Sequence, residues 1–470
     1  MGPVSSRKQS IVFIGGGPGG YESALVAAQL GADVTVVDRD GLGGAAVLTD
    51  CVPSKALIAT SDFMSRFKAA GRLGVGFEGT GDDQHAEAHL SAVNRRILTL
   101  AKAQSRDIQA QVESVGGRVI QGTGRISGPR EVEVTPDDGE ARTLKADMVL
   151  VSVGCTPRVL PSAMPDGERI LTWQQIYDLQ ELPEHLIVVG SGVTGAELAH
   201  AYLGLGCEVT LVSSRDRVLP GEDADAATVI ENVFRRRGMK VLNRSRASGA
   251  RRDGDGVVVS LEDGREVHGS HVLLAVGGIP QTSGLGLEEA GVEVNDGGYI
   301  QVDRVSRTAA PGIYAAGDCT GILPLASVAA MQGRTAVAHF LGDHVAPLNL
   351  RGVCANIFTD PEIATVGYSQ ADIESGKADG RIVTLPLSTN PRAKMRNIND
   401  GFVKLFARPG SNTVIGGVVV APQASEMIYP IGVAVQNRLT AEQLASTFSV
   451  YPSMSGSIGE AARRLHSLES

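Results

Sequence analysis

Apolar and polar positions near the start of the chain alternate in blocks. An apolar run at residues 11–14 leads into the glycine-rich stretch 15–20, and residues 22–30 are rich in alanine and leucine. A second apolar run at 34–37 ends on Asp38. Short apolar runs bounded by glycine predict buried strands, whereas the alanine-rich stretch predicts a helix. The order strand, turn, helix, strand predicts a βαβ unit.

The same order recurs in the middle of the chain. Residues 186–189 form an apolar run, residues 190–195 are glycine-rich, 196–205 fit a helix, and 209–212 form another apolar run. Two βαβ units predict two parallel sheets with right-handed crossovers.

Each predicted unit is followed by segments with strand alternation and turn residues. Residues 118–148 predict an antiparallel excursion that returns to a strand at 149–151, and 257–267 predict another that returns at 272–274. From about Leu350 onward the pattern becomes mixed, with no third glycine fingerprint. The predicted fold class is α/β, with two Rossmann-like domains and a separate α+β domain at the C-terminal end.

Composition narrows the partners of the chain. The 470 residues are 43% hydrophobic and 20% charged, with a formal net charge of −9, which argues against nucleic acid and anionic membrane surfaces as partners. No membrane-length apolar run or signal-peptide pattern occurs, so a cytoplasmic location is expected. The five scattered cysteines lack metal-type spacing and no HExxH is present, so no bound metal is expected.

Both glycine-rich stretches follow a predicted strand and open a predicted helix, which is the context that a dinucleotide site requires. Glycines allow a tight turn and close backbone approach, and the helix N-terminus offers N–H groups to a pyrophosphate. The candidate glycines are Gly15, Gly17 and Gly20 in the first stretch and Gly190, Gly192 and Gly195 in the second.

The residue that ends the second strand of each unit predicts which nucleotide is held. Asp38 lies 23 positions after Gly15 and can accept hydrogen bonds from the ribose hydroxyls of an adenosine without a 2′-phosphate. The corresponding position after Gly190 is Ser213, followed closely by Arg215 and Arg217. A site without the acid and with guanidinium groups is predicted to accept NADPH, either alone or together with NADH. Alternatively, the two arginines are solvated turn residues.

Further motifs resemble those of the two-dinucleotide-binding flavoproteins, and most closely the pyridine nucleotide-disulfide oxidoreductases such as lipoamide dehydrogenase and glutathione reductase. Residues 308–318 resemble the second FAD motif, with Asp318 in place of the aspartate that binds the ribityl chain. Residues 152–157 and 275–280, with Gly154 and Gly277, resemble the crossover motifs between domains. Residues 358–367 and 390–394 resemble the C-terminal dimerisation domain.

The resemblance implies FAD as cofactor, NADPH or NADH as co-substrate, and a homodimer. It implies these domain ranges: 1–155 and 279–348 for FAD binding, 156–278 for NAD(P)H binding, and 349–470 for the dimer interface.

The redox helix of the family reads G-G-x-C-x-x-x-x-C-x-P-S-K, and its two cysteines form a disulfide. Here the segment begins at Gly43 and Gly44, and Ala46 replaces the first cysteine while Cys51 occupies the place of the flavin-facing one. Lys55 and Glu197 match the lysine and glutamate that pair near the flavin in the family. We expect hydride transfer from nicotinamide to flavin to be intact. Cys51 is expected to be either a thiolate beside the flavin or an inert packed thiol.

The C-terminal motif of the family, H-P-T-x-S-E, supplies an acid-base histidine held by a glutamate. This chain has Tyr451 and Gly456 at those two positions. Tyrosine, with a reference pKa near 10, is a poor replacement for a histidine near neutrality. Dithiol–disulfide exchange would therefore lack both a sulfur and a proton carrier.

These features favour an FAD-dependent NAD(P)H:quinone oxidoreductase that passes electrons directly from the flavin to a quinone or a similar small acceptor. The alternatives are a soluble pyridine nucleotide transhydrogenase and a single-cysteine NAD(P)H oxidase or peroxidase that uses Cys51. A non-catalytic flavoprotein is disfavoured, because Lys55, Glu197 and both glycine turns are kept.

Overall fold

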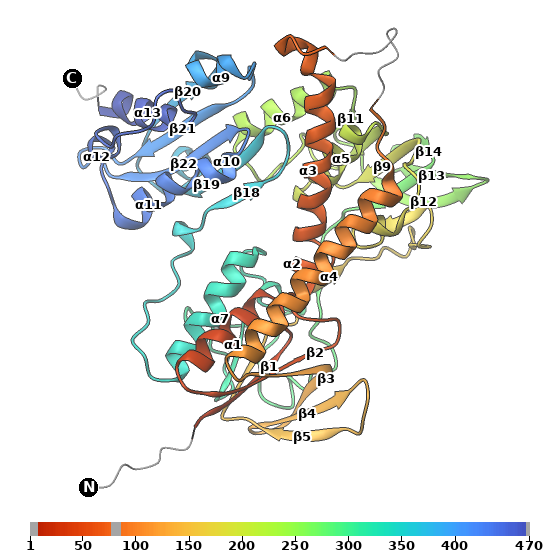
Figure 1. Cartoon of the computed structure of the whole chain (residues 1–470), viewed down its shortest axis with the longest axis vertical. Coiled ribbons are helices and arrows are strands. Elements are labelled where there is room, and N and C mark those ends of the chain that lie inside the picture. Colours follow the sequence, from red (N-terminus) through yellow and green to blue (C-terminus); the bar gives the residue numbers. More distant parts are fainter. Residues whose placement is uncertain (1–7, 77–85, 467–470) are drawn as a thin grey trace. The chain divides into compact units, whose positions relative to one another are not determined.

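The chain forms two compact units, which are described one at a time. The computed structural model describes residues 8–76 and 86–466. Unit 1 draws on Met1–Ser54, Arg95–Arg158 and Gly277–Leu348, and unit 2 on Lys55–Asn94, Val159–Val276 and Asn349–Ser470. Two long helices, α3 (Cys51–Lys68) and α4 (Leu90–Ser114), contain residues of both units (Figure 1).

Unit 1 is built on a seven-stranded sheet with the order β17-β6-β1-β2-β3-β4-β5. The strands from β17 to β3 pair in parallel, and β3, β4 and β5 continue as an antiparallel meander. The strands are β1 (Ser10–Ile14), β2 (Asp33–Asp38), β3 (Arg118–Gly128), β4 (Glu131–Pro136), β5 (Arg142–Lys145), β6 (Met148–Val151) and β17 (Ile313–Ala315). Its other elements are α1 (Pro18–Gln29), α2 (Gly44–Leu48), η3 (Asp318–Thr320), α7 (Ala326–Phe340), β7 (Cys155–Pro157) and β16 (Gly278–Pro280).

Strands β1, β2 and β6 of the sheet in unit 1 are buried on both faces. Ile11 and Phe13 of β1 pack into a core shared with α1 and α7, which lie side by side in Figure 1. Val12 and Ile14 point to the other face and pack with residues of β4 and β6. Burial on both faces explains why the strand is an unbroken apolar run.

Unit 2 contains a five-stranded parallel sheet with the order β11-β10-β9-β15-β8. An antiparallel three-stranded sheet, β12-β13-β14, lies in the same chain segment. The elements are β8 (Ile170–Thr172), η2 (Gln175–Asp178), β9 (His185–Val189), α5 (Val193–Leu205), β10 (Glu208–Val212), α6 (Ala224–Arg236), β11 (Lys240–Leu242), β12 (Ala247–Asp253), β13 (Gly256–Leu261), β14 (Glu266–Gly269) and β15 (His271–Leu274). The short η1 (Ala70–Leu73) follows α3.

Unit 2 also contains the C-terminal domain, an antiparallel sheet with the order β18-β19-β22-β21-β20 and helices packed on it. The strands are β18 (Ala355–Ile357), β19 (Glu362–Gly367), β20 (Arg381–Pro386), β21 (Phe402–Ala407) and β22 (Val414–Ala421). The helices are η4 (Leu350–Gly352), α8 (Gln370–Glu374), η5 (Leu387–Thr389), α9 (Pro391–Met395), α10 (Ala424–Met427), α11 (Tyr429–Asn437), α12 (Ala441–Ala445) and α13 (Gly456–His466).

Both predicted βαβ units, both antiparallel excursions and the C-terminal α+β domain are confirmed. The helix predicted at 22–30 begins earlier, at Pro18, and the one predicted at 196–205 begins at Val193. The reason is that the last glycine of each turn, Gly20 or Gly195, lies inside the first helical turn. Among the described residues, no helix combines the length and apolar character that crossing a membrane demands.

Candidate active site and nucleotide-binding turns

The first glycine turn joins β1 to α1, and its first and last glycines leave no room for a side chain. Gly15 has φ +99°, and a Cβ there would lie 2.3 Å from the carbonyl oxygen of Ser152. A Cβ at Gly20 would lie 2.0 Å from the carbonyl oxygen of Gly15. A Cβ at Gly17 would meet only the Ser152 oxygen, at 3.9 Å. The outer glycines are therefore required by protein packing, whereas a Cβ at the middle one would make only an ordinary van der Waals contact.

The second turn, between β9 and α5, repeats this arrangement. Gly190 has φ +112° and its Cβ would lie 2.2 Å from the carbonyl oxygen of Ala275. The Cβ of residue 195 would lie 1.9 Å from the carbonyl oxygen of Gly190, and the middle glycine, Gly192, has nothing within 4 Å. Because Gly17 and Gly192 are the N-caps of α1 and α5, the open side of each turn is a helix N-terminus without a side-chain cap. These residues fit a dinucleotide pyrophosphate.

Asp38 lies at the end of β2 and braces the first turn. Its Oδ2 accepts a hydrogen bond from the N–H of Gly16 at 2.6 Å, and its Oδ1 accepts from the N–H groups of Asp40 and Gly41 at 2.8 and 2.9 Å. Burial raises the pKa of the Asp38 carboxyl, and these three N–H groups oppose that rise. Carboxylate oxygens have further lone pairs, so the same group can also accept from ribose hydroxyls.

Ser213 takes the corresponding place in the second turn but is fully buried. Its hydroxyl shares a hydrogen bond of 2.7 Å with the Ser191 hydroxyl and accepts from the N–H of Arg215 at 3.1 Å. Ser213 therefore stabilises the turn from its buried side, while the neighbouring Ser214 and Arg215 are exposed. Arg217, the other predicted arginine, is half-buried, and its Nη2 donates to the Pro220 carbonyl at 3.5 Å.

Lys55 from α3 and Glu197 from α5 form an ion pair. The Lys55 Nζ lies 2.8 Å from the Glu197 Oε2, with the lysine side chain 29% and the glutamate side chain 4% exposed. The other carboxylate oxygen, Oε1, accepts from the N–H of Phe358 at 2.9 Å. The Lys55 ammonium also lies 4.9 Å from the centre of the Phe358 ring. Both members of the pair are thus held by the residue that follows β18.

The role of Phe358 was missed at the sequence level, where it was only the first residue of a motif resembling the dimerisation domain. Its contribution to Glu197 comes through the backbone N–H, which every residue except proline has. No residue-type pattern could have revealed it.

The crossover strands of unit 1 bring two predicted motifs together. β7 and β16 pair antiparallel, and their flanking glycines, Gly154 and Gly277, have φ of +66° and +93° with nothing within 4 Å of a Cβ. The Cys155 thiol donates to the carbonyl oxygen of Asp318 at 3.6 Å. Burial raises the pKa of Cys155 to about 12, so this thiol stays protonated near neutrality.

Asp318 begins η3, separated by two residues from the end of the strand β17. Burial raises the pKa of its carboxyl. The preceding residue, Gly317, has φ +84°, and its N–H donates to Oε1 of Gln332 on α7 at 2.8 Å. Gln332 is buried and was not predicted as a site residue, because an isolated glutamine in an alanine-rich helix carries no motif.

The segment that resembles the redox helix is divided into α2 and α3. Gly44 has φ +55°, and a Cβ there would lie 2.8 Å from the Cα of Gly17, so α2 begins against the first glycine turn. Ala46 lies in α2 and Cys51 is the first residue of α3. The described residues include all five cysteines, and none of them forms a disulfide.

The two residues that differ from the C-terminal motif of the family, Tyr451 and Gly456, lie just before α13 and at its start. Tyr451 is 82% exposed within the single chain. Gly456 is the first residue of α13, and its N–H donates to the Ser453 hydroxyl at 3.1 Å. A glycine has no side chain with which to hold another group.

Comparison with known families identifies the chain. Residues 9–333 match the family described as pyridine nucleotide-disulphide oxidoreductase, and residues 353–462 match the dimerisation domain of that family. The chain belongs to the pyridine nucleotide-disulphide oxidoreductases. It is therefore an oxidoreductase with the predicted α/β fold and a dimerisation domain, and membership implies FAD and NAD(P)H as its cofactors.

Relatives within this family are similar over the whole chain. A protein of Mycobacterium tuberculosis named NAD(P)H dehydrogenase (quinone) is 56% identical over 464 residues, covering 97% of this chain and 93% of the relative. The dihydrolipoyl dehydrogenase of Geobacillus stearothermophilus is 32% identical over 465 residues, covering 98% and 97%. The crystal structure of LpdA from Mycobacterium tuberculosis superposes with a TM-score of 0.92 at 55% identity, covering 97% of this chain and 99% of that chain.

Proposed function

We propose that this oxidoreductase takes hydride from NAD(P)H onto FAD and passes the electrons directly to a quinone or a similar small acceptor. The observation that carries the proposal is an asymmetry. The Lys55–Glu197 ion pair is intact, whereas Ala46 stands where a disulfide reductase has its first redox cysteine.

The input half is supported by the two glycine turns and by the ion pair. We assign residues 1–155 and 279–348 to FAD binding, 156–278 to NAD(P)H binding and 349–470 to the dimer interface. Glu197 orients the Lys55 ammonium, and Phe358 restrains both groups. FAD, when bound, would supply the ring that accepts the hydride from NAD(P)H and from which the acceptor would be reduced.

The output half lacks what dithiol exchange needs. Cys51 has no second thiol at residue 46 with which to form a disulfide. Tyr451 is exposed in place of the histidine base, and Gly456 cannot orient it. Exchange with a disulfide substrate requires a thiolate attack and a proton carrier, so a direct electron transfer from the flavin is the simpler route.

The name of the Mycobacterium tuberculosis relative supports a quinone as acceptor, because that protein is 56% identical over nearly the whole chain. The nucleotide site supports NADPH as well as NADH. Ser213 puts no carboxylate at the ribose end, and Arg215 is exposed beside it. The match to the dimerisation domain supports a homodimer as the working form.

The test is an anaerobic reductive titration of the FAD-loaded protein, followed by a panel of acceptors. NADPH is expected to bleach the flavin, and menadione is expected to reoxidise it with ping-pong kinetics. Lipoamide and glutathione disulfide are expected to give no turnover. Negligible turnover with every quinone, combined with rapid reduction of a thio-NAD analogue by NADPH, would identify a transhydrogenase instead.

A Cys51→Ser variant separates the remaining alternative. Quinone turnover is expected to survive the change, because no step of the proposed route passes through the thiol. Peroxide or oxygen turnover in the wild-type protein that disappears in Cys51→Ser would establish a single-cysteine oxidase or peroxidase.

A further inference from the structure

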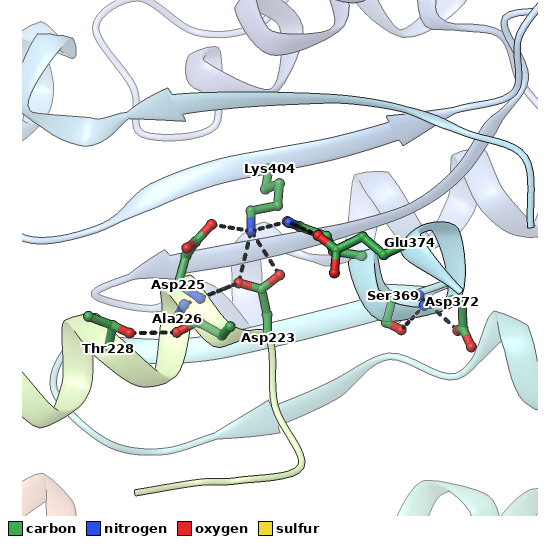
Figure 2. A network of polar contacts seen from close by, with 10 residues as sticks. Asp223, Asp225, Ala226, Thr228, Ser369, Asp372, Glu374 and Lys404 are labelled. Atoms are coloured by element: carbon green, nitrogen blue, oxygen red, sulfur yellow. Dashed lines mark hydrogen bonds and ion pairs between the residues drawn. The ribbon is translucent and has the colours of Figure 1, made fainter. Parts of the chain in front are cut away.

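A lysine is buried in the C-terminal domain, far along the chain from any predicted site residue. Lys404 lies in the middle of β21, and its side chain is only 1% exposed. Its ammonium contacts Asp223 and Asp225 at the start of α6 and Gln370 on α8 (Figure 2). A buried lysine without partners would be very costly, so this constellation explains how the residue is tolerated.

The strand places Lys404 on the sheet face opposite the helix-covered core. Val403 and Leu405, its neighbours on β21, pack into the core of the C-terminal domain. Side chains alternate along a strand, so Lys404 shares the other face with Phe402, whose ring centre lies 5.3 Å from the ammonium. That face is where the start of α6 meets the domain.

The ammonium has four acceptors within hydrogen-bond distance. The Asp223 oxygens lie 2.9 and 2.8 Å away, the Asp225 Oδ2 lies 2.7 Å away, and the Gln370 Oε1 lies 2.7 Å away. The Asp223 side chain is 3% exposed, whereas that of Asp225 is 63% exposed. Lys404 is therefore the main charge partner of a buried carboxylate, and Asp225 is a partner that water can replace.

Asp223 also ends the loop that follows the nucleotide strand β10. It is the N-cap of α6, accepting from the N–H groups of Asp225 and Ala226 at 3.1 Å each. This loop comprises residues 213–223. At its start the Ser213 hydroxyl forms a hydrogen bond with the Ser191 hydroxyl, and in its middle the N–H of Leu219 donates to the Ser191 carbonyl at 2.8 Å. Two further hydrogen bonds hold it: the N–H of Arg244 donates to the Arg215 carbonyl at 2.7 Å, and the N–H of Val218 donates to Oε2 of Glu231 on α6 at 3.2 Å. At its end the loop is held by the ion pair between Asp223 and Lys404.

Between the attachments at Ser213 and Leu219 the loop presents the exposed residues Ser214, Arg215 and Asp216. We propose that Lys404 is a positioning residue for the nucleotide: by holding Asp223, it fixes the loop that presents Arg215 to the adenosine end of NAD(P)H. The inference rests on the proposed function only in assigning this loop to the nucleotide. Lys404 belongs to the C-terminal domain, so that domain takes part in nucleotide binding as well as in dimerisation.

The test compares nucleotide affinity in three forms of the FAD-loaded protein by calorimetry with NADP⁺ and NAD⁺. In Lys404→Met the buried Asp223 carboxylate loses its partner and the loop must move to hydrate it. The dissociation constant for NADP⁺ is expected to rise about 30-fold, which is more than the loss of Arg215 alone would cause, because movement of the loop also displaces Leu219 from the Ser191 carbonyl in the glycine turn. In Lys404→Met with Asp223→Asn, no buried charge remains and asparagine still caps α6, so the rise is expected to be about fivefold.

Arg236→Met is the matched control. Arg236 lies at the other end of α6 and pairs with Asp400 through exposed side chains. Its loss is expected to leave both dissociation constants unchanged. Stopped-flow reduction by NADPH supplies a second measurement: the limiting rate of flavin bleaching is expected to stay within about threefold in every variant, because the Lys55–Glu197 pair is untouched.

The proposal would be overturned if Lys404→Met and the double variant both bind the nucleotides with wild-type dissociation constants. Each variant must also have a normal flavin content and melting temperature. If Lys404→Met does not fold, the double variant alone decides, because it leaves no buried charge. A limiting rate that falls while affinity is unchanged would also overturn it. Failure of the proposed function would give a different result. The wild-type protein itself would then not bind NADP⁺, or its flavin would not be bleached by NADPH. The NAD⁺ measurements would still test the role of the loop.

Discussion

The two glycine turns of this enzyme have the same steric plan and differ at the ribose end. In both, the outer glycines are required because a carbonyl oxygen lies about 2 Å from the position of a Cβ, whereas a Cβ at the middle glycine would not clash. The first turn is braced by a carboxylate, Asp38, that takes the N–H of Gly16. The second is braced by a neutral hydroxyl pair, Ser213 with Ser191. The turn geometry is thus independent of the charge of the residue that braces it.

The helices after the turns differ in a second way. Glu22 and Glu197 lie at the same offset, seven residues after the first glycine of their turns. Glu22 is partly exposed, and Arg334 lies 4.0 Å from its carboxylate. Glu197 is buried and holds Lys55 at 2.8 Å. The same position on the same scaffold is therefore a surface residue in one domain and part of the candidate active site in the other.

The strongest way to break this comparison is to fill one turn at a time. In Gly195→Val a Cβ would lie 1.9 Å from the Gly190 carbonyl oxygen, and in Gly20→Val 2.0 Å from that of Gly15. We expect Gly195→Val to retain flavin but raise the KM for NADPH by roughly 100-fold, because the clash pushes the start of α5 away from the end of β9 and distorts the turn that would hold the pyrophosphate. Gly20→Val should instead be purified without flavin. Absorbance spectra measure the bound flavin, and steady-state kinetics measure the KM. If Gly195→Val lost the flavin and Gly20→Val kept it, the assignment of the two turns would be reversed.

Much of this comparison could be predicted from the sequence. The apolar runs and glycine spacing were sufficient for both βαβ units, because a strand buried on both faces and a tight turn each leave a local pattern. The strand β12 (Ala247–Asp253) was not predicted, because its residues are mostly polar and it is defined by its pairing with β13.

The candidate site was predictable only where a residue type carries its own chemistry. Lys55 and Glu197 were found through a motif, and the structure brings them together. Phe358 acts through its backbone N–H, and Lys404 depends on a carboxylate 181 positions away along the chain. Ser213 was predicted as the position where the acid is absent, and its hydrogen bond with the Ser191 hydroxyl is a contact that no local pattern could reveal.

The comparison of the two glutamates is tested by removing one charge at a time. Glu197→Gln leaves the Lys55 ammonium without its anionic partner, so we expect the limiting rate of flavin reduction by NADPH to fall roughly tenfold or more. Glu22→Gln is the matched control and should change this rate by less than about twofold, because its ion pair is exposed. Stopped-flow bleaching measures both. Equal effects of the two changes would show that the buried pair has no special role in hydride transfer.

The charge difference at the ribose end is tested by giving the second turn the acid of the first. In Ser213→Asp the new carboxylate can accept from the Ser191 hydroxyl but repels a 2′-phosphate. We expect kcat/KM for NADPH to fall about tenfold relative to that for NADH, or about 1.4 kcal/mol of discrimination. Ser213→Ala is the control, because it removes the hydroxyl without adding charge, and should change both nucleotides alike. An unchanged ratio in Ser213→Asp would mean that this strand end does not read the ribose.

The smallest expected effect concerns Arg215, the exposed guanidinium beside that position. A solvent-exposed charge contributes little to a contact, so Arg215→Ala should raise the KM for NADPH only about threefold and leave the KM for NADH unchanged. The effect should shrink as salt is added, because exposed charge pairs are screened. Steady-state kinetics at low and high salt measures this. If Arg215→Ala weakens NADPH and NADH equally, or neither of them, the arginine is a solvated loop residue, and the selectivity at this end of the nucleotide comes only from the missing carboxylate.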